Sequence, residues 1–178
     1  GVFETWKKRI PWLLLLMISA AFTGSIITSF EDALSVCVIL TAYIPMLMDT
    51  GGNAGGQASV TIIRGLSLNE IEFSDALLVV WKEIRVAMLC GLTLAVANFA
   101  KLLLFDKVTV LVAAVVCLTL MAAVLIAKVV GCILPMLAKK IGFDPAVMAS
   151  PFITTSVDAL SLLIYFRIAT LFLNIGAG

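Results

Sequence analysis

The sequence contains no histidine, and this absence excludes histidine-dependent catalytic triads and histidine metal sites. Charged residues make up only 13% of the chain and the formal net charge is +1, so we expect no nucleic-acid or acidic partner. No cleavable signal peptide is evident, because the first apolar run is long and is followed by more such runs. The cysteines lie in apolar runs without C-x-x-C spacing, so we interpret them as buried thiols rather than disulfides or zinc ligands. They are Cys37, Cys90, Cys117 and Cys132.

Apolar residues are present in large excess. They make up 62% of the 178 residues, against about 45–50% in a soluble domain, and the charges collect at the ends of apolar runs. We therefore expect an all-α integral membrane protein of the lipid bilayer, with a short interfacial segment at 1–10 and a C-terminal tail at 176–178. Five transmembrane helices are predicted at about 11–30, 33–63, 83–104, 108–138 and 146–175.

Two of these spans are longer than a bilayer requires. At ~1.5 Å per residue the second would reach roughly 46 Å, well beyond a ~30 Å hydrocarbon core, so it must tilt, break or project. Its glycine-rich stretch, 51–56, is the expected place for a break. The fourth span carries Lys128, Gly131 and Pro135 toward its end, which predicts a kink and a lysine that snorkels to the surface.

The connection between the second and third spans, 64–82, is the longest hydrophilic stretch. It is either an ordinary amphipathic connector or an interfacial helix capped by Ser74. The basic residues orient the spans, since most fall on one side of the membrane and only Lys101, Lys107 and Arg167 belong to the other. The positive-inside rule then places the N-terminus in the cytoplasm and the C-terminus outside. The first group is Lys7, Lys8, Arg9, Arg64, Lys82, Arg85, Lys139 and Lys140.

Two polar stripes at helical spacing cross the apolar spans. They are Asp49, Asn53 and Gln57 in the second span, and Ser150, Thr154 and Asp158 in the fifth. Asp158 has no basic residue within one helical turn. A carboxylate in that position must be protonated, bonded to another span, or neutralised by a cation.

Both stripes lie at a similar depth. Asp158 is roughly 21 Å along a helix from Asp144, and Asn53 and Asp49 are roughly 16 and 22 Å from Arg64. Carboxylates, carboxamides, hydroxyls and glycine-exposed carbonyls at one level form an all-oxygen environment that suits Mg²⁺ or Ca²⁺. The predicted cation ligands are Asp158, Asn53, Asp49, Gly52, Gln57 and Thr154.

Three features of the sequence each allow two interpretations. The pairs Gly51/Gly55 and Gly52/Gly56 either pack against another helix or border the site. Asp49 either joins the site or pairs with Arg64 or solvent. Asp144 is either an ion-entry ligand or the N-cap of the fifth span, and the following Pro145 favours the cap.

The same residues also allow other functions. Asp49 and Asp158 together would allow an intramembrane aspartyl hydrolase, although Asp158 lacks the Gly-x-Gly context of that class. A protonatable Asp158 would also suit a proton-coupled cation carrier. A phosphate loop is excluded, because Gln57-Ala58 replaces the required Lys-Ser/Thr after the glycines.

Three sequence motifs are similar to the membrane domain of the MgtE family of magnesium channels and transporters, over essentially the whole chain. They are Pro45-Met-Leu-Met-Asp-Thr-Gly-Gly-Asn-Ala-Gly-Gly-Gln57, Ile63-Arg-Gly-Leu66 with Glu70-Ile71, and Asp144-Pro-Ala through Ser150-Pro-Phe-Ile-Thr-Thr-Ser-Val-Asp158.

The resemblance implies a transporter rather than an enzyme, in the plasma (inner) membrane. It implies a homodimer whose single cation pore is lined by the second and fifth spans of both subunits. Asp158 would be the central carboxylate for hydrated Mg²⁺, which is both the transported ion and a bound ligand. Asn53 and the neighbouring glycine carbonyls would face it, and Asp144 would add a cytoplasmic-side contact.

Typical members of that family also carry a cytoplasmic N-terminal domain and a CBS pair that close the pore. Neither is present in the sequence, and Gly1 is not a natural start. The chain is therefore expected to be either an excised membrane domain or a short relative that is regulated otherwise.

Overall fold

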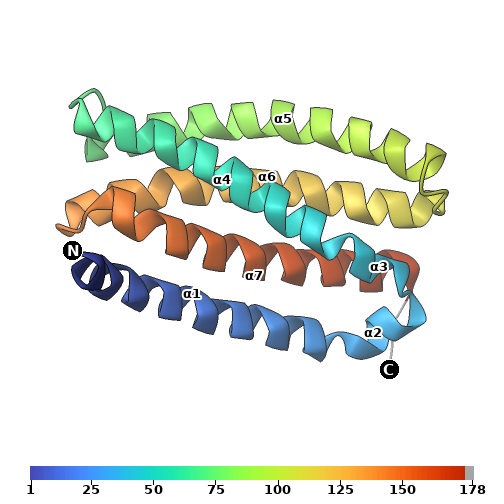
Figure 1. Ribbon diagram of the computed structural model, residues 1–178. Helices are drawn as coiled ribbons and strands as arrows, with labels where there is room; N and C mark the ends of the chain where they lie inside the picture. The colour runs from blue at the N-terminus through green and yellow to red at the C-terminus, as the bar shows by residue number, and fades with distance from the viewer. Residues whose placement is uncertain (175–178) are drawn as a thin grey trace.

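The computed structural model describes residues 1–174, and every regular element in that range is a helix (Figure 1). The all-α prediction is confirmed. The elements are α1 (Val2–Ser29), α2 (Glu31–Val36), α3 (Ile39–Ala42), α4 (Ile44–Ser67), the short 3-10 turn η1 (Phe73–Asp75), α5 (Ala76–Leu104), α6 (Val110–Lys140) and α7 (Pro145–Leu173). The predicted tail, 176–178, and the last residue of the predicted fifth span lie outside the described residues.

Of the helices within residues 1–174, four are long and apolar enough to cross a membrane: α1, η1 with α5, α6 and α7. The chain is therefore a multi-pass membrane protein. Although α4 has 24 residues, it is not among the four, and it carries the glycines and polar side chains of the first stripe. The fifth span remains a prediction.

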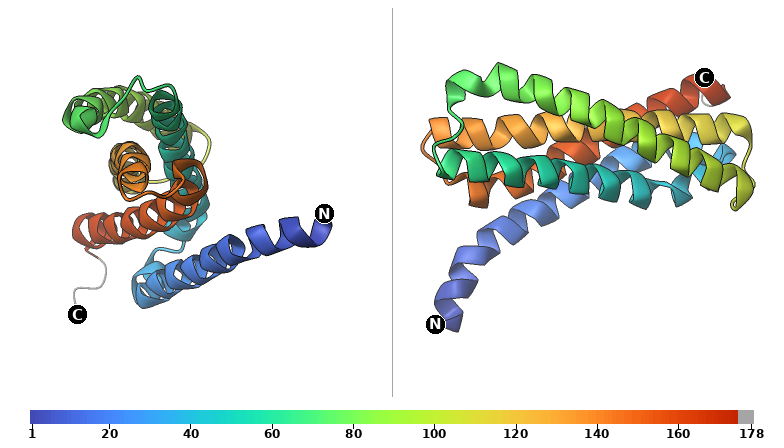
Figure 2. Two further views of the ribbon diagram at one scale, coloured as in Figure 1. Left: turned by 90° about the vertical axis from the view of Figure 1, so that its left-hand side faces the viewer. Right: turned by 90° about the horizontal axis from the view of Figure 1, so that it is seen from above.

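The centre of the bundle is α6, which packs against α4, α5 and α7 (Figure 2). Its apolar character runs all round, and side chains such as Val115, Ala123 and Ala127 are fully buried. In addition to α6, α7 packs against α4 and α1. In contrast, α1 diverges from the bundle toward its N-terminus, and only Thr23 and Ile26 are buried along its length.

The predicted second span is broken, but not at the expected place. The glycine-rich stretch lies in the continuous helix α4, whereas the chain breaks at Cys37–Val38 and again at Tyr43. Pro45 explains the second break, because in an unbroken helix its ring would clash with the carbonyl of Thr41. The Tyr165 hydroxyl donates to the Leu40 carbonyl at 2.7 Å and so helps satisfy the backbone near the break.

The glycines stay helical because another helix holds them. A Cβ on Gly131 of α6 would collide with the carbonyl oxygen of Gly55 on α4. A Cβ on Gly55 would lie 2.8 Å from Ile153 Cγ2 and 3.1 Å from the Ala127 oxygen. Tertiary packing therefore overrides the weak helix propensity of glycine at this crossing.

The structure corrects two further expectations from the sequence and decides one open alternative. The connection between α4 and α5 is only 68–75, because both helices extend into the predicted 64–82 connector. Ser74 does not cap a helix there; it lies inside η1, where the Glu72 N–H donates to Asp75 Oδ2 at 2.9 Å. Lys128 does not snorkel to the surface, since it is only 5% exposed and pairs with Glu83 at 3.7 Å.

The helix ends that carry the larger group of basic residues lie at one end of the bundle. These are the start of α1, the end of α4, the start of α5 and the end of α6 (Figure 1). Lys139 Nζ also donates to the Leu66 carbonyl at 2.8 Å, which joins the end of α6 to the end of α4. The orientation of this end toward the cytoplasm remains a prediction from the positive-inside rule.

Candidate cation site between α4 and α7

A cleft of about 610 Å³ lies between α4 and α7, and we call it the α4–α7 cleft. Five of the six predicted cation ligands line it, namely Asp49, Gly52, Asn53, Thr154 and Asp158; Gln57 and the candidate entry ligand Asp144 do not. Ile44, Pro45 and Met48 also line the cleft, and they were not predicted as site residues. The two polar stripes, about a hundred residues apart in the chain, therefore meet on one surface.

The helical period of α4 explains why these side chains reach the cleft. Leu47, Gly51, Ala58 and Ile62 are buried on the inner side of the helix. Residues offset from them, including Asp49 and Asn53, fall on the outer side and are exposed.

Of the two glycine pairs of α4, one packs against other helices and the other is open to the outer side of the helix. Gly51 and Gly55 are packing positions, because an added Cβ would lie 2.8 Å from Val157 Cγ1 and from Ile153 Cγ2, respectively. Gly52 and Gly56 meet nothing within 4 Å, so their backbone is open to the outer side. Of this second pair, Gly52 lines the α4–α7 cleft itself, and Gly56 lies one turn further along the same side of α4.

Asp158 is half-buried on α7, because its neighbours Ile153, Val157 and Ser161 turn into the bundle and leave it at the boundary. None of the side-chain hydrogen bonds and ion pairs formed among residues 1–174 involves its carboxylate. One turn away, the Thr154 hydroxyl donates to the Ser150 carbonyl at 3.1 Å. Its oxygen lone pairs remain available to a cation or its water.

The α4 side supplies a second carboxylate and a carboxamide. Asn53 Nδ2 donates to Asp49 Oδ2 at 3.3 Å, which leaves the Asn53 carbonyl oxygen as a free acceptor. Asp49 does not pair with Arg64 in the part of the chain that the structure describes. The alternative in which Asp49 serves as the partner of that arginine is therefore not observed.

A smaller cavity of about 190 Å³ continues along the same two helices. It shares Gly52 and Thr154 with the cleft and adds Gly56, Ser59 and Ser150. The direction is toward the start of α7, so polar atoms follow the α4–α7 seam over several turns.

Asp144 does not line the cleft. Its Oδ1 accepts a hydrogen bond from the Ala146 N–H at 3.0 Å, and Pro145 follows at the first helical position. The N-cap prediction is therefore confirmed. The side chain is exposed at the end of the bundle, so the cap does not seal it from solvent.

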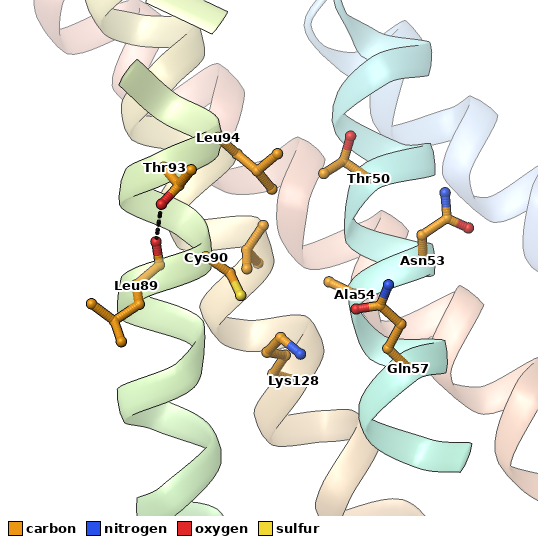
Figure 3. Close-up of a pocket in the computed structure, with 10 residues that line it drawn as sticks. Thr50, Asn53, Ala54, Gln57, Leu89, Cys90, Thr93, Leu94 and Lys128 are labelled. Atoms are coloured by element: carbon orange, nitrogen blue, oxygen red, sulfur yellow. Dashed lines mark hydrogen bonds between the residues drawn. The ribbon is translucent and has the colours of Figure 1, made fainter. Parts of the chain in front are cut away.

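Gln57 also lies outside the cleft, contrary to the predicted stripe. It lines a second cavity, of about 410 Å³, between α4, α5 and α6 (Figure 3). At 100° per residue, an i, i+4, i+8 series drifts by about 80° around the helix, which is enough to carry Gln57 off the face of Asp49. Asn53, halfway along the series, borders both cavities.

The α4–α7 cleft suits a hydrated hard cation. Its donors are oxygens of carboxylates, a carboxamide and a hydroxyl, the groups that Mg²⁺ prefers. Six waters at ~30 Å³ each occupy roughly 180 Å³, well within the cleft volume. Among the described residues no three Asp, Glu, Cys or His side chains lie close enough to form a metal cage. An ion that keeps most of its water fits this sparse donor set.

Comparison with known proteins gives one family. The family model MgtE, described as a divalent cation transporter, matches residues 44–168. Three curated relatives are each named "Magnesium transporter MgtE". The protein of Thermus thermophilus is 37% identical over 98% of this chain, that of Bacillus subtilis 37% over 94%, and that of Enterococcus faecalis 32% over 94%. The chain spans only 38%, 37% and 37% of their respective lengths.

Proposed function

The chain belongs to the MgtE family of divalent cation transporters, and on this basis we propose that it carries Mg²⁺ across the plasma membrane. The ion is the cargo and binds transiently in the α4–α7 cleft. The single observation that carries this proposal is the Asp158 carboxylate, which faces the cleft without a basic partner.

The cleft residues divide the work by charge and polarity. Asp158 supplies the attraction, because an unpaired carboxylate at membrane depth is stabilised by a cation beside it. The Asn53 carbonyl and the Thr154 hydroxyl accept hydrogen bonds from the water shell of the ion, so the ion need not be stripped. Asp49 adds a second negative charge, and Gly52 leaves room where a side chain would narrow the passage.

We further propose that the pore forms at a homodimer interface lined by α4 and α7 of both subunits. Asp49, Asn53 and Thr154 are exposed in the single chain, and polar side chains facing lipid are costly. A second copy would shield them and supply a second set of the same donors. In this arrangement Asp144, exposed at the start of α7, provides a further contact for the ion on the cytoplasmic side.

The alternative functions lose support. The family matched is one of transporters and not of enzymes, so an intramembrane hydrolase that uses Asp49 and Asp158 is not favoured. The effect of a pH gradient on Mg²⁺ flux distinguishes a proton-coupled carrier from a channel. We expect Mg²⁺ flux into liposomes to be unchanged when a pH gradient is imposed, whereas a carrier would respond to it.

The proposal is tested by Asp158→Asn in cells that lack other Mg²⁺ importers. At a few ångströms and an effective dielectric of about 20–80, the lost attraction for a divalent ion is roughly 3 kcal/mol, or on the order of 100-fold in affinity. We expect growth on limiting Mg²⁺ to fail. The matched control is Asp32→Asn in α2, which makes the same chemical change at an exposed position outside the cleft. Wild-type growth of the Asp158→Asn strain, at equal membrane expression, would overturn the proposal.

A further inference from the structure

The cavity on the other side of α4 is bordered by one member of a buried ion pair, Lys128–Glu83, that the proposed function does not use. This α4–α5–α6 cavity is lined by Thr50, Asn53, Gln57, Cys90, Thr93 and Lys128, together with apolar side chains (Figure 3). It exists because α4 and α5 both pack on α6 but hardly meet each other.

Lys128 places a positive charge in this cavity. The residue is 5% exposed, and its Nζ lies 3.7 Å from Glu83 Oε2, with the two side chains 7% and 13% exposed. The other ion pairs formed within residues 1–174 involve more exposed side chains, at Glu4 and at Asp106. A lysine and a glutamate buried in transmembrane helices are expensive to keep, which indicates a functional role.

The ammonium group of Lys128 faces the open space of the cavity. Lys128 lines the cavity, whereas Glu83 does not, so the positive end of the pair is the one presented to the open space. Figure 3 shows the lysine nitrogen pointing toward α4, where Gln57 extends from the facing helix. Without that ammonium, the Glu83 carboxylate, which lies 3.7 Å from the lysine nitrogen, would have no cationic partner, and the polar end of the cavity beside Gln57 would suit a cation.

Asn53 makes this space relevant to transport, because it borders both cavities. A cation that reaches Asn53 has carboxylates on the α7 side and an ammonium on the α5 side. We propose that Lys128 is a tethered cation that fills the polar end of the α4–α5–α6 cavity, neutralises Glu83 and excludes mobile divalent cations. Cations are thereby confined to the α4–α7 cleft. This inference rests on the proposed function, since it concerns the path of the same cargo.

The experiment exchanges the two charges. In Glu83→Lys/Lys128→Glu the ion pair is retained, but the carboxylate now occupies the position that faces the cavity. The full chain carries Asp49→Asn and Asp158→Asn as a background, which removes the carboxylates of the α4–α7 cleft, and is studied in lipid nanodiscs. The probe is Mn²⁺, counted by electron paramagnetic resonance and competed with Mg²⁺. Glu83→Gln/Lys128→Met in the same background is the neutral control.

We expect the exchanged variant to bind one additional Mn²⁺ per chain, at least tenfold more tightly than the neutral control, and Mg²⁺ to displace it. Lys128→Gln alone, which leaves the Glu83 charge, is expected to gain the same site and decides the question if the exchanged variant does not fold. No gain of Mn²⁺ binding in either folded variant would overturn the inference. Folding of the neutral control alone would also overturn it, because the placement of the two charges would then affect folding only and not the access of cations to the cavity.

These outcomes are separate from the test of the proposed function. In the chain with both cleft aspartates intact, failure to bind Mn²⁺ in competition with Mg²⁺ would count against the α4–α7 cleft. It would leave the result on the exchanged pair unaffected, because that result is obtained in a background from which the cleft carboxylates have been removed.

Discussion

The two cavities beside α4 share a helix and one residue, Asn53, but differ in charge. The α4–α7 cleft contains Asp49 and Asp158 with no basic partner, whereas in the α4–α5–α6 cavity Lys128 is balanced by Glu83. Their volumes, about 610 and 410 Å³, would each hold a hydrated ion. Size therefore does not distinguish the two cavities. What distinguishes them is which charge faces the open space.

The largest effect on stability is expected at the contact between α4 and α6, where Gly131 packs against Gly55. Gly131→Ala places a methyl group against the carbonyl oxygen of Gly55, and a backbone atom has little freedom to move away. Overpacking typically costs about 1–3 kcal/mol, and a contact with a backbone atom falls at the upper end of that range. The free energy of unfolding, measured by denaturation in mixed micelles, should fall accordingly.

Gly52→Ala is the matched control, because its Cβ meets nothing within 4 Å. Replacing a helical glycine by alanine should leave stability unchanged or raise it by up to ~1 kcal/mol. Equal destabilisation by the two substitutions would show that the contact between Gly131 and Gly55 is no tighter than the open position of Gly52.

A smaller effect should separate the cleft face of α4 from its other face. Asn53→Ala removes the carboxamide that accepts hydrogen bonds from the water shell of the ion and donates to Asp49. A loss of about 1.4 kcal/mol, or tenfold in Mg²⁺ uptake at limiting concentration, is expected. Gln57→Ala should reduce uptake by less than about twofold, since its side chain lines the other cavity. If Gln57→Ala reduced Mg²⁺ uptake more than Asn53→Ala, the α4–α5–α6 cavity and not the α4–α7 cleft would be the path of the ion.

Helical periodicity was sufficient to predict most of the residues of the cleft. Asp158, Thr154, Asn53 and Asp49 were found because polar residues at i, i+4 spacing are rare in apolar spans. The same rule failed at Gln57, where the accumulated drift of the helix exceeds the width of one face.

Long-range contacts explain what could not be predicted. The glycine-rich stretch has weak helix propensity, so a break was expected there, but Gly131, some 80 residues away, holds Gly55 in a continuous helix. The prediction that Lys128 snorkels was wrong because its partner, Glu83, lies on another helix and could not be identified from the residues around Lys128. Neither pairing has a local signature in the sequence.

The smallest effect concerns a carboxylate that, unlike Asp158, has a base beside it. Asp106, in the loop between α5 and α6, accepts hydrogen bonds at Oδ2 from Lys101 Nζ at 2.6 Å and from the Tyr43 hydroxyl at 2.9 Å. These bonds, that from Lys101 first, hold the pKa of Asp106 below its usual value. Tyr43 stands at the break before α4, so this contact fixes the end of the helix that carries Asp49.

The sign of the pH dependence follows from the direction of that shift. A carboxyl group whose pKa is lower in the folded state stabilises the fold above its usual pKa of about 3.9, and the contribution is lost as pH falls through the lowered value. Asp106→Asn should therefore lower the Tm slightly at pH 7, and the difference from the wild type should shrink as the pH falls below about 4. A difference that stays constant from neutral to acidic pH would show that the contact is steric and that the charge of Asp106 does not anchor α4. Asp158→Asn should not show this pattern of stability, because its carboxylate has no basic partner whose attraction is lost on protonation.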